Sequence, residues 1–119
     1  LVAAQRLLRR MPVGESVVEA ILRLVRSARP GEPDASPTLG GAVAFGPGPR
    51  AAQALMMAVR ARALLTGRLA PSVADVAALA RPALKHRMAL TFAARAEGRT
   101  LEQVIDGLVS DALALEAAA

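Results

Sequence analysis

Residues 46–68, GPGPRAAQALMMAVRARALLTGR, place an alanine- and leucine-rich stretch between a Gly-Pro lead-in and a closing Gly-Arg. Proline is tolerated at the first helical position because its missing N–H has no partner there, and glycine after the last turn readily takes the left-handed conformation that ends a helix. We therefore predict a helix from about Pro49 to Thr66, stopped by Gly67. One face of this helix is apolar and carries Ala52, Leu55, Met56, Val59 and Ala63.

The composition favours packed helices around this one. Hydrophobic residues make up 54% of the chain and are mostly Ala, Leu and Val, and the only aromatic residues are Phe45 and Phe92. Strands are enriched in β-branched and aromatic residues, so this composition is unlike that of a sheet protein. A chain of 119 residues has the length of one domain. The sequence predicts a single all-α domain over residues 1–119, a small bundle of about four to five helices.

Two helices are predicted before residue 30. The first spans Val2–Arg10 and ends before Pro12, since a residue that precedes proline avoids the helical region. The second is predicted to begin at Ser16, where Ser16 and Glu19 have the spacing of a capping box. Its apolar residues recur at helical spacing and are Val17, Val18, Ile21, Leu22, Val25 and Ala28.

Two further helices are predicted after residue 70. Ser72 provides an N-cap with Asp75 in the first turn, and Pro82 is expected to break or kink this helix before a short helical turn over residues 83–87. A capping box at residues 100–103, TLEQ, begins the last helix. That helix presents its apolar residues on one face, namely Leu101, Val104, Ile105, Leu108 and Ala112.

Residues 30–49 are predicted to form a long loop. They hold five of the eight prolines and five of the nine glycines, which argues against a continuous helix or a central strand. Loops of this length within a small domain are uncommon and are usually functional or disordered. We expect a partly ordered loop that is anchored by the short apolar stretch at residues 42–45.

Arg50 lies at the electrostatically unfavourable end of its helix, because the N-terminus of a helix carries partial positive charge. A surface arginine that happens to follow a turn is the plain interpretation. An anion in front of the helix would reverse the penalty, because backbone N–H groups and a guanidinium can bind one phosphate together. The net charge of +5 also indicates an anionic partner such as a phosphate, a nucleic acid or an acidic protein surface.

Several kinds of site are excluded by the residues themselves. The chain has no cysteine and a single histidine, His86, so it cannot build a zinc site and no metal is expected. It contains neither G-x-x-x-x-G-K-[ST] nor G-x-G-x-x-G, so a nucleotide would need a partner domain. Arginine and proline interrupt every apolar run, so no membrane span is expected, and the absence of cysteine favours an intracellular protein.

Three separated motifs resemble the C-terminal helical lid of MoxR-type AAA+ ATPases. They are the quoted residues 46–68, residues 72–88, SVADVAALARPALKHRM, and residues 97–105, EGRTLEQVI, and they follow the order and spacing of the family. The resemblance covers about residues 46–105. It implies a helical lid domain and a chain that is a fragment of a longer ATPase.

The resemblance also implies roles for residues near the start of the third helix. Arg50 matches the arginine that the family uses as sensor 2, which reaches the phosphates of ATP bound on the large subdomain, and Gly48 and Pro49 precede it at the nucleotide. Gly48 stands where the family pattern has serine. ATP and Mg are expected with the full-length protein and no cofactor with the fragment. The fragment should not hydrolyse ATP, because the Walker A and B motifs are missing.

Partners follow from the same resemblance. Lys85, His86 and Arg87 match a basic triplet of the family and are a possible interface with an adjacent subunit or subdomain. The expected partners are the large AAA+ subdomain of the same chain, neighbouring ATPase subunits in a homo-oligomeric ring, and proteins with von Willebrand A-type domains. A chaperone-like role in the bacterial cytoplasm is implied, with no membrane partner.

The alternative is a stand-alone basic helical module that binds nucleic acid or an acidic protein. At 100° per residue, Arg50, Arg60 and Arg62 do not form one ridge on the third helix. Two aromatic residues are also too few to build a platform for stacking bases, so a nucleic acid is not the favoured partner.

Overall fold

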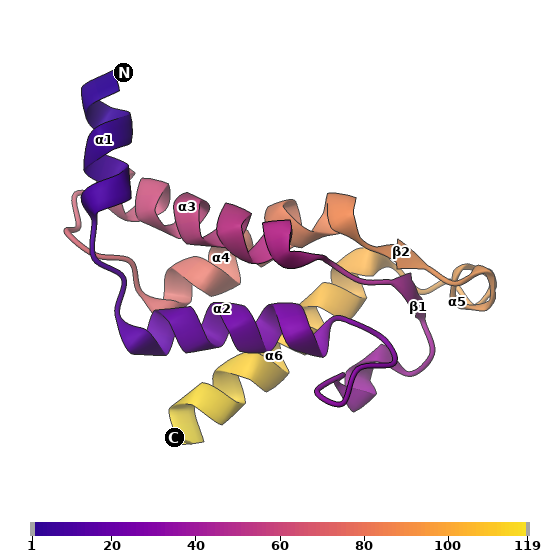
Figure 1. Cartoon of the computed structure of the whole chain (residues 1–119). Helices are drawn as coiled ribbons and strands as arrows, with labels where there is room; N and C mark the ends of the chain where they lie inside the picture. Colours follow the sequence, from indigo (N-terminus) through magenta and orange to yellow (C-terminus); the bar gives the residue numbers. More distant parts are fainter. Residues whose placement is uncertain (1, 119) are drawn as a thin grey trace.

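The computed structural model describes residues 2–118, and these form a helical bundle with one very short sheet (Figure 1). The predicted all-α fold is confirmed. None of the helices in this described part is long and apolar enough to cross a membrane. The elements in chain order are α1 (Val2–Arg10), α2 (Glu15–Ser27), the 3-10 turn η1 (Pro37–Leu39), β1 (Val43–Phe45), α3 (Pro49–Leu65), α4 (Val73–Leu84), the 3-10 turn η2 (Lys85–Arg87), β2 (Ala89–Leu90), α5 (Phe92–Ala96) and α6 (Leu101–Ala118).

The core lies among four helices. α2 contacts α3, α4 and α6, and the consecutive helices α3 and α4 also contact each other. α6 runs diagonally across the bundle, whereas α1 stands away from it and contacts α3 (Figure 1). The apolar faces of these helices supply the core, because burying them removes the largest apolar area from water. Most residues of the faces predicted for α2, α3 and α6 are buried there, whereas Leu24 of α2 is buried without having been predicted. The largest fully buried apolar side chains on these helices are Ile21, Leu24, Leu55, Leu84, Ile105 and Leu108.

The loop of residues 30–49 contains a strand that the sequence did not predict. Val43 pairs with Leu90, and Phe45 pairs with Ala89, in an antiparallel sheet of β1 and β2. Val43 is buried and anchors the loop as expected, whereas the side chain of Phe45 is 58% exposed. Because Phe45 lies opposite Ala89, the start of α3 and the η2 turn both lie at the sheet end of the bundle (Figure 1).

The predicted start of α2 is wrong, and of the two outcomes expected at Pro82, a break does not occur. α2 begins at Glu15 with Gly14 as its N-cap, because the Gly14 carbonyl already accepts from the N–H groups of the third and fourth residues after it, each at 3.1 Å. Ser16 therefore lies inside the first turn and caps nothing. Pro82 does not break α4, which continues to Leu84. Proline so close to the end removes one backbone bond, and the complete burial of Leu84 holds the last turn on the core.

The capping box of α6 is confirmed. The Thr100 hydroxyl accepts from the Gln103 backbone N–H at 3.2 Å, and the Gln103 side-chain oxygen accepts from the Thr100 backbone N–H at 3.2 Å. At the end of α3, Gly67 has a left-handed φ of +77° and closes the helix as predicted.

Gly107, in the middle of α6, allows the 30–49 loop to approach this helix closely. A Cβ atom at residue 107 would lie 2.7 Å from Thr38 Cγ2. The hydroxyls of Ser36 and Thr38 both donate to the carboxylate of Asp111, one turn further along α6. Rotating Thr38 out of the way would therefore break one of the bonds that hold the loop.

Gly107→Ala is expected to destabilise the domain by about 1 kcal/mol, because the added methyl overpacks against Thr38. In the background of Thr38→Ser, which removes Cγ2 and keeps the hydroxyl, the same change should stabilise by up to about 1 kcal/mol, since alanine is the better helix former. Urea denaturation of the four proteins measures both effects. An equal effect of Gly107→Ala in the two backgrounds would show that the contact with Thr38 is not the reason for the glycine.

Candidate functional site at the start of α3

The segment that leads into α3 is held against the end of α2. Gly46 lies so close to the Ala28 backbone that an added Cβ atom would stand 2.3 Å from the Ala28 carbonyl oxygen. The next residue, Pro47, is fully buried, and its carbonyl oxygen accepts a hydrogen bond of 2.8 Å from Arg29 Nε. The chain is therefore fixed in position two residues before the N-cap of α3.

The first turn of α3 is not capped by a side chain. The N-cap is Gly48, whose backbone is extended with φ −88° and ψ −172°, and Pro49 occupies the first helical position. Both residues are exposed. A serine at the N-cap would place its oxygen in front of the first amides, whereas glycine leaves the space open. These residues offer partial positive charge to whatever lies in front of the helix.

Arg50 follows in this first turn and its side chain is exposed. No hydrogen bond or ion pair joins it to any residue that the structure describes. By contrast, Arg62 in the last turn of α3 and Arg68 in the turn that follows are both held by a carboxylate. Arg50 is thus free to bind an anion that approaches the helix N-terminus.

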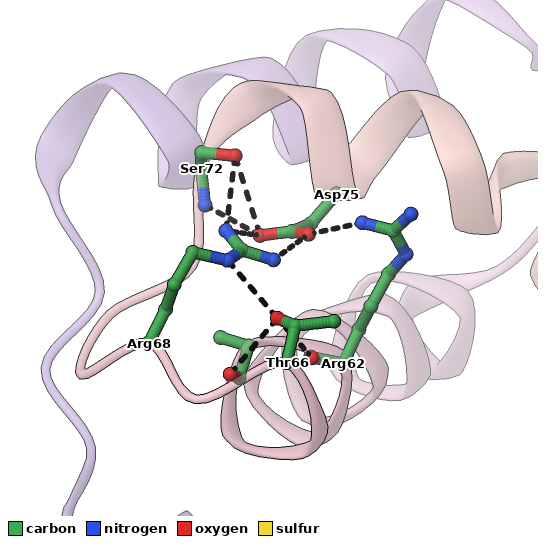
Figure 2. Close-up of polar contacts among 6 residues, drawn as sticks. Arg62, Thr66, Arg68, Ser72 and Asp75 are labelled. Carbon is green, nitrogen blue, oxygen red and sulfur yellow. Dashed lines mark hydrogen bonds and ion pairs between the residues drawn. The ribbon is translucent and has the colours of Figure 1, made fainter.

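Asp75 holds the opposite end of α3 (Figure 2). It is fully buried, and its Oδ1 accepts from Arg62 Nη1 at 2.7 Å and from Arg68 Nη2 at 2.5 Å. Its Oδ2 accepts from Arg68 Nη1 at 2.8 Å and from the Ser72 backbone N–H at 2.7 Å. One carboxylate therefore joins the last turn of α3, the turn that follows and the first turn of α4.

The backbone turn after α3 brings Arg68 to this carboxylate. The Gly67 N–H donates to the Leu64 carbonyl at 3.1 Å and the Arg68 N–H donates to the Ala63 carbonyl at 2.8 Å, the two bonds of a Schellman motif. The hydrogen bonds from Arg68 hold the pKa of Asp75 well below its usual range, although burial of the carboxylate acts in the opposite direction. The sequence indicated Asp75 as a capping acid but gave no sign of its two arginine partners.

The basic triplet lies on η2, which contacts α4 and α6. Lys85, His86 and Arg87 are all exposed. Lys85 Nζ pairs with Glu102 Oε1 at 2.6 Å, and Arg87 Nη1 donates to the Ala83 carbonyl at 3.0 Å. Two of the three side chains thus make contacts inside the domain, and no described hydrogen bond or ion pair links the triplet to Arg50.

Comparison with known proteins assigns the fold. The AAA lid domain family matches residues 40–108, which is more than half of the chain, so the chain belongs to that family. The match includes the start of α3, the Asp75 network and η2. Across residues 2–118, no group of His, Cys, Asp and Glu side chains could hold a metal ion.

A solved structure has the same fold. It is the crystal structure of a candidate ATPase from Cytophaga hutchinsonii, which superposes with a TM-score of 0.84 at 24% sequence identity. The match covers 92% of this chain and 33% of that one, so this chain spans about a third of the length of its structural relative. No curated protein matches the chain.

Proposed function

We propose that this domain is the lid of a MoxR-type AAA+ ATPase and that Arg50 is its sensor 2, reaching from the lid to the phosphates of ATP on the ATPase domain. The observation that carries the proposal is an exposed guanidinium in an uncapped first helical turn, which no carboxylate of the described residues holds. A phosphate in front of α3 converts the unfavourable position of Arg50 in the helix dipole into a favourable one. The proposal requires an ATPase domain with a Walker A motif in the same polypeptide.

The residues at this site suit a phosphate. A guanidinium presents a planar fork of N–H donors that can bind two phosphate oxygens at once. Gly48 and Pro49 add no bulky or acidic side chain in front of the helix, so the phosphate can approach the first turn. Mg²⁺ and ATP, bound by the ATPase domain, bring the charge that Arg50 stabilises as the phosphoryl group is transferred.

The lid would also transmit the state of the nucleotide. Binding of the phosphate by Arg50 ties the lid to the ATPase domain, and hydrolysis releases it, so the two domains move relative to each other. The exposed triplet of Lys85, His86 and Arg87 would contact an adjacent subunit or subdomain. We place the parent protein in a ring of identical subunits in the bacterial cytoplasm, with a chaperone-like role toward partners that include von Willebrand A-type proteins.

Arg50→Ala in the full-length protein is expected to lower kcat for ATP hydrolysis by about 100-fold, the usual effect of removing one donor to a developing negative charge. The melting temperature should stay unchanged, because the side chain is exposed. Arg50→Lys keeps the charge but lacks the planar fork of N–H donors, so its kcat should lie between those of Arg50→Ala and the natural protein. Arg95→Ala, at an exposed arginine on α5, serves as the matched control. If Arg50→Ala hydrolyses ATP as the natural protein does, Arg50 is not sensor 2.

A further inference from the structure

Among the described residues, the side chain of Arg29 makes one long-range hydrogen bond, and it is with the segment that leads into α3. It lies directly after Ala28, the C-cap of α2, and its Nε donates to the Pro47 carbonyl at 2.8 Å across 18 residues of sequence. The bond is charge-assisted and therefore stronger than one between neutral groups. The position also suits a cation, because the C-terminus of a helix carries partial negative charge.

The contact controls a stretch of chain that has little freedom of its own. Gly46 lies against the Ala28 carbonyl, and the rings of Pro47 and Pro49 fix two φ angles. Gly48 is the one residue between the Pro47 carbonyl and α3, and the proline that follows restricts it to an extended backbone, here with φ −88° and ψ −172°. The direction in which α3 begins therefore depends on where Arg29 holds the Pro47 carbonyl.

We propose that Arg29 is a positioning residue for Arg50: by holding the Pro47 carbonyl, it aims the first turn of α3 and with it the guanidinium of Arg50. The inference rests on the proposed sensor role of Arg50. It adds that the end of α2 controls this site, so that a shift of α2 relative to α3 reaches Arg50 through this hydrogen bond and through the contact of Gly46 with the Ala28 backbone. A displacement of about 1 Å can reduce turnover roughly 100-fold in other enzymes. A small displacement of the Arg50 guanidinium is therefore enough to lower kcat measurably.

A double-mutant cycle on the full-length protein tests this inference. Arg29→Ala alone should lower kcat for ATP hydrolysis by about tenfold, less than the full cost of a 1 Å displacement. In the background of Arg50→Ala, the same change should have no further effect, because Arg29 acts through Arg50. Arg29→Lys keeps the charge but places a methylene where Nε stood, so it should lower kcat by a smaller factor. Arg26→Ala, at an exposed arginine one turn earlier, should leave kcat unchanged.

The outcomes separate the two proposals. If Arg50→Ala lowers kcat and Arg29→Ala lowers it by the same factor in both backgrounds, Arg29 only stabilises the fold, and the positioning role is wrong while the sensor role stands. If Arg50→Ala has no effect, the sensor role fails and the positioning role fails with it. Melting curves show whether Arg29→Ala is folded at the assay temperature. If Arg29→Ala is unfolded at that temperature, the cycle is run with Arg29→Lys instead. A loss of kcat only when Arg50 is present supports the positioning role, and an equal loss in both backgrounds rejects it.

Discussion

Asp75→Ala is expected to lower the free energy of unfolding of the domain by about 3 kcal/mol. The substitution removes a fully buried carboxylate that accepts hydrogen bonds from Arg62, Arg68 and the Ser72 backbone N–H. Removing one partner of a buried ion pair leaves the charge of the other partner unpaired, which typically costs about 3–5 kcal/mol. The low end applies here, since the side chains of Arg62 and Arg68 are 41% and 37% exposed and water can solvate them.

The pair of Arg81 and Asp106 provides the matched control. It is also an arginine–aspartate ion pair, but its side chains are 53% and 51% exposed. Asp106→Ala should therefore cost much less stability than Asp75→Ala, because water already solvates both of its charged groups. Urea denaturation at pH 7 measures both variants. Equal losses for Asp75→Ala and Asp106→Ala would mean that burial of the carboxylate adds nothing to its contribution.

The contribution of Asp75 should also depend on pH. Its pKa is lower in the folded protein than the value of about 3.9 expected for an unfolded chain, mainly because of the hydrogen bonds from Arg68. A group with a lowered pKa stabilises the fold above its unfolded pKa, and this contribution is lost as the pH falls below it. Between pH 6 and pH 3, the natural protein should therefore lose more stability than Asp75→Asn. The slope that remains in the variant belongs to the other acids, including Asp106, whose pKa is also lowered by its arginine.

Local signals predicted the helices well and their long-range partners poorly. The ends of α3 and the capping box of α6 were predicted because the deciding residues lie within one turn of each other. The pairing of β1 with β2 was missed, because its two halves lie more than 40 residues apart and neither resembles a strand by itself. The capping box predicted at Ser16 failed for a similar reason, since the burial of α2 on the core allows a helix to begin without a side-chain cap.

The candidate site was predicted in the same partial way. The sequence places Arg50 in the first turn of α3, and the structure has it there, exposed. The role of Arg50 stays a prediction. The contact of Arg29 with Pro47 could not be foreseen, because a carbonyl 18 residues away is identified only by the folded chain. The close contact of Gly46 with the Ala28 backbone could not be foreseen either, because it also joins residues that are far apart in the sequence.

Gly46→Ala is expected to destabilise the domain by about 3 kcal/mol, at the upper end of the usual cost of overpacking. The added Cβ would lie 2.3 Å from the Ala28 carbonyl oxygen and 2.9 Å from Arg29 Cα. Both are backbone atoms, so no side-chain rotation relieves the contact, and the end of α2 must move away from the segment before α3. That movement lengthens the hydrogen bond from Arg29 to the Pro47 carbonyl and redirects the first turn of α3.

Gly48→Ser is the control. It shows whether the loss of stability in Gly46→Ala comes from the contact of residue 46 with the α2 backbone or from replacing any glycine in this segment. The space around Gly48 is open, and its extended backbone is one that serine adopts readily. Serine also caps a helix slightly better than glycine does, so this variant should gain a few tenths of a kcal/mol. Urea denaturation compares the two variants with the natural protein, and hydrogen exchange at the amides of residues 46, 48 and 50–52 locates the change. If Gly46→Ala were as stable as Gly48→Ser, the backbones of α2 and this segment would not be in contact, and the path from Arg29 to Arg50 would lose its basis.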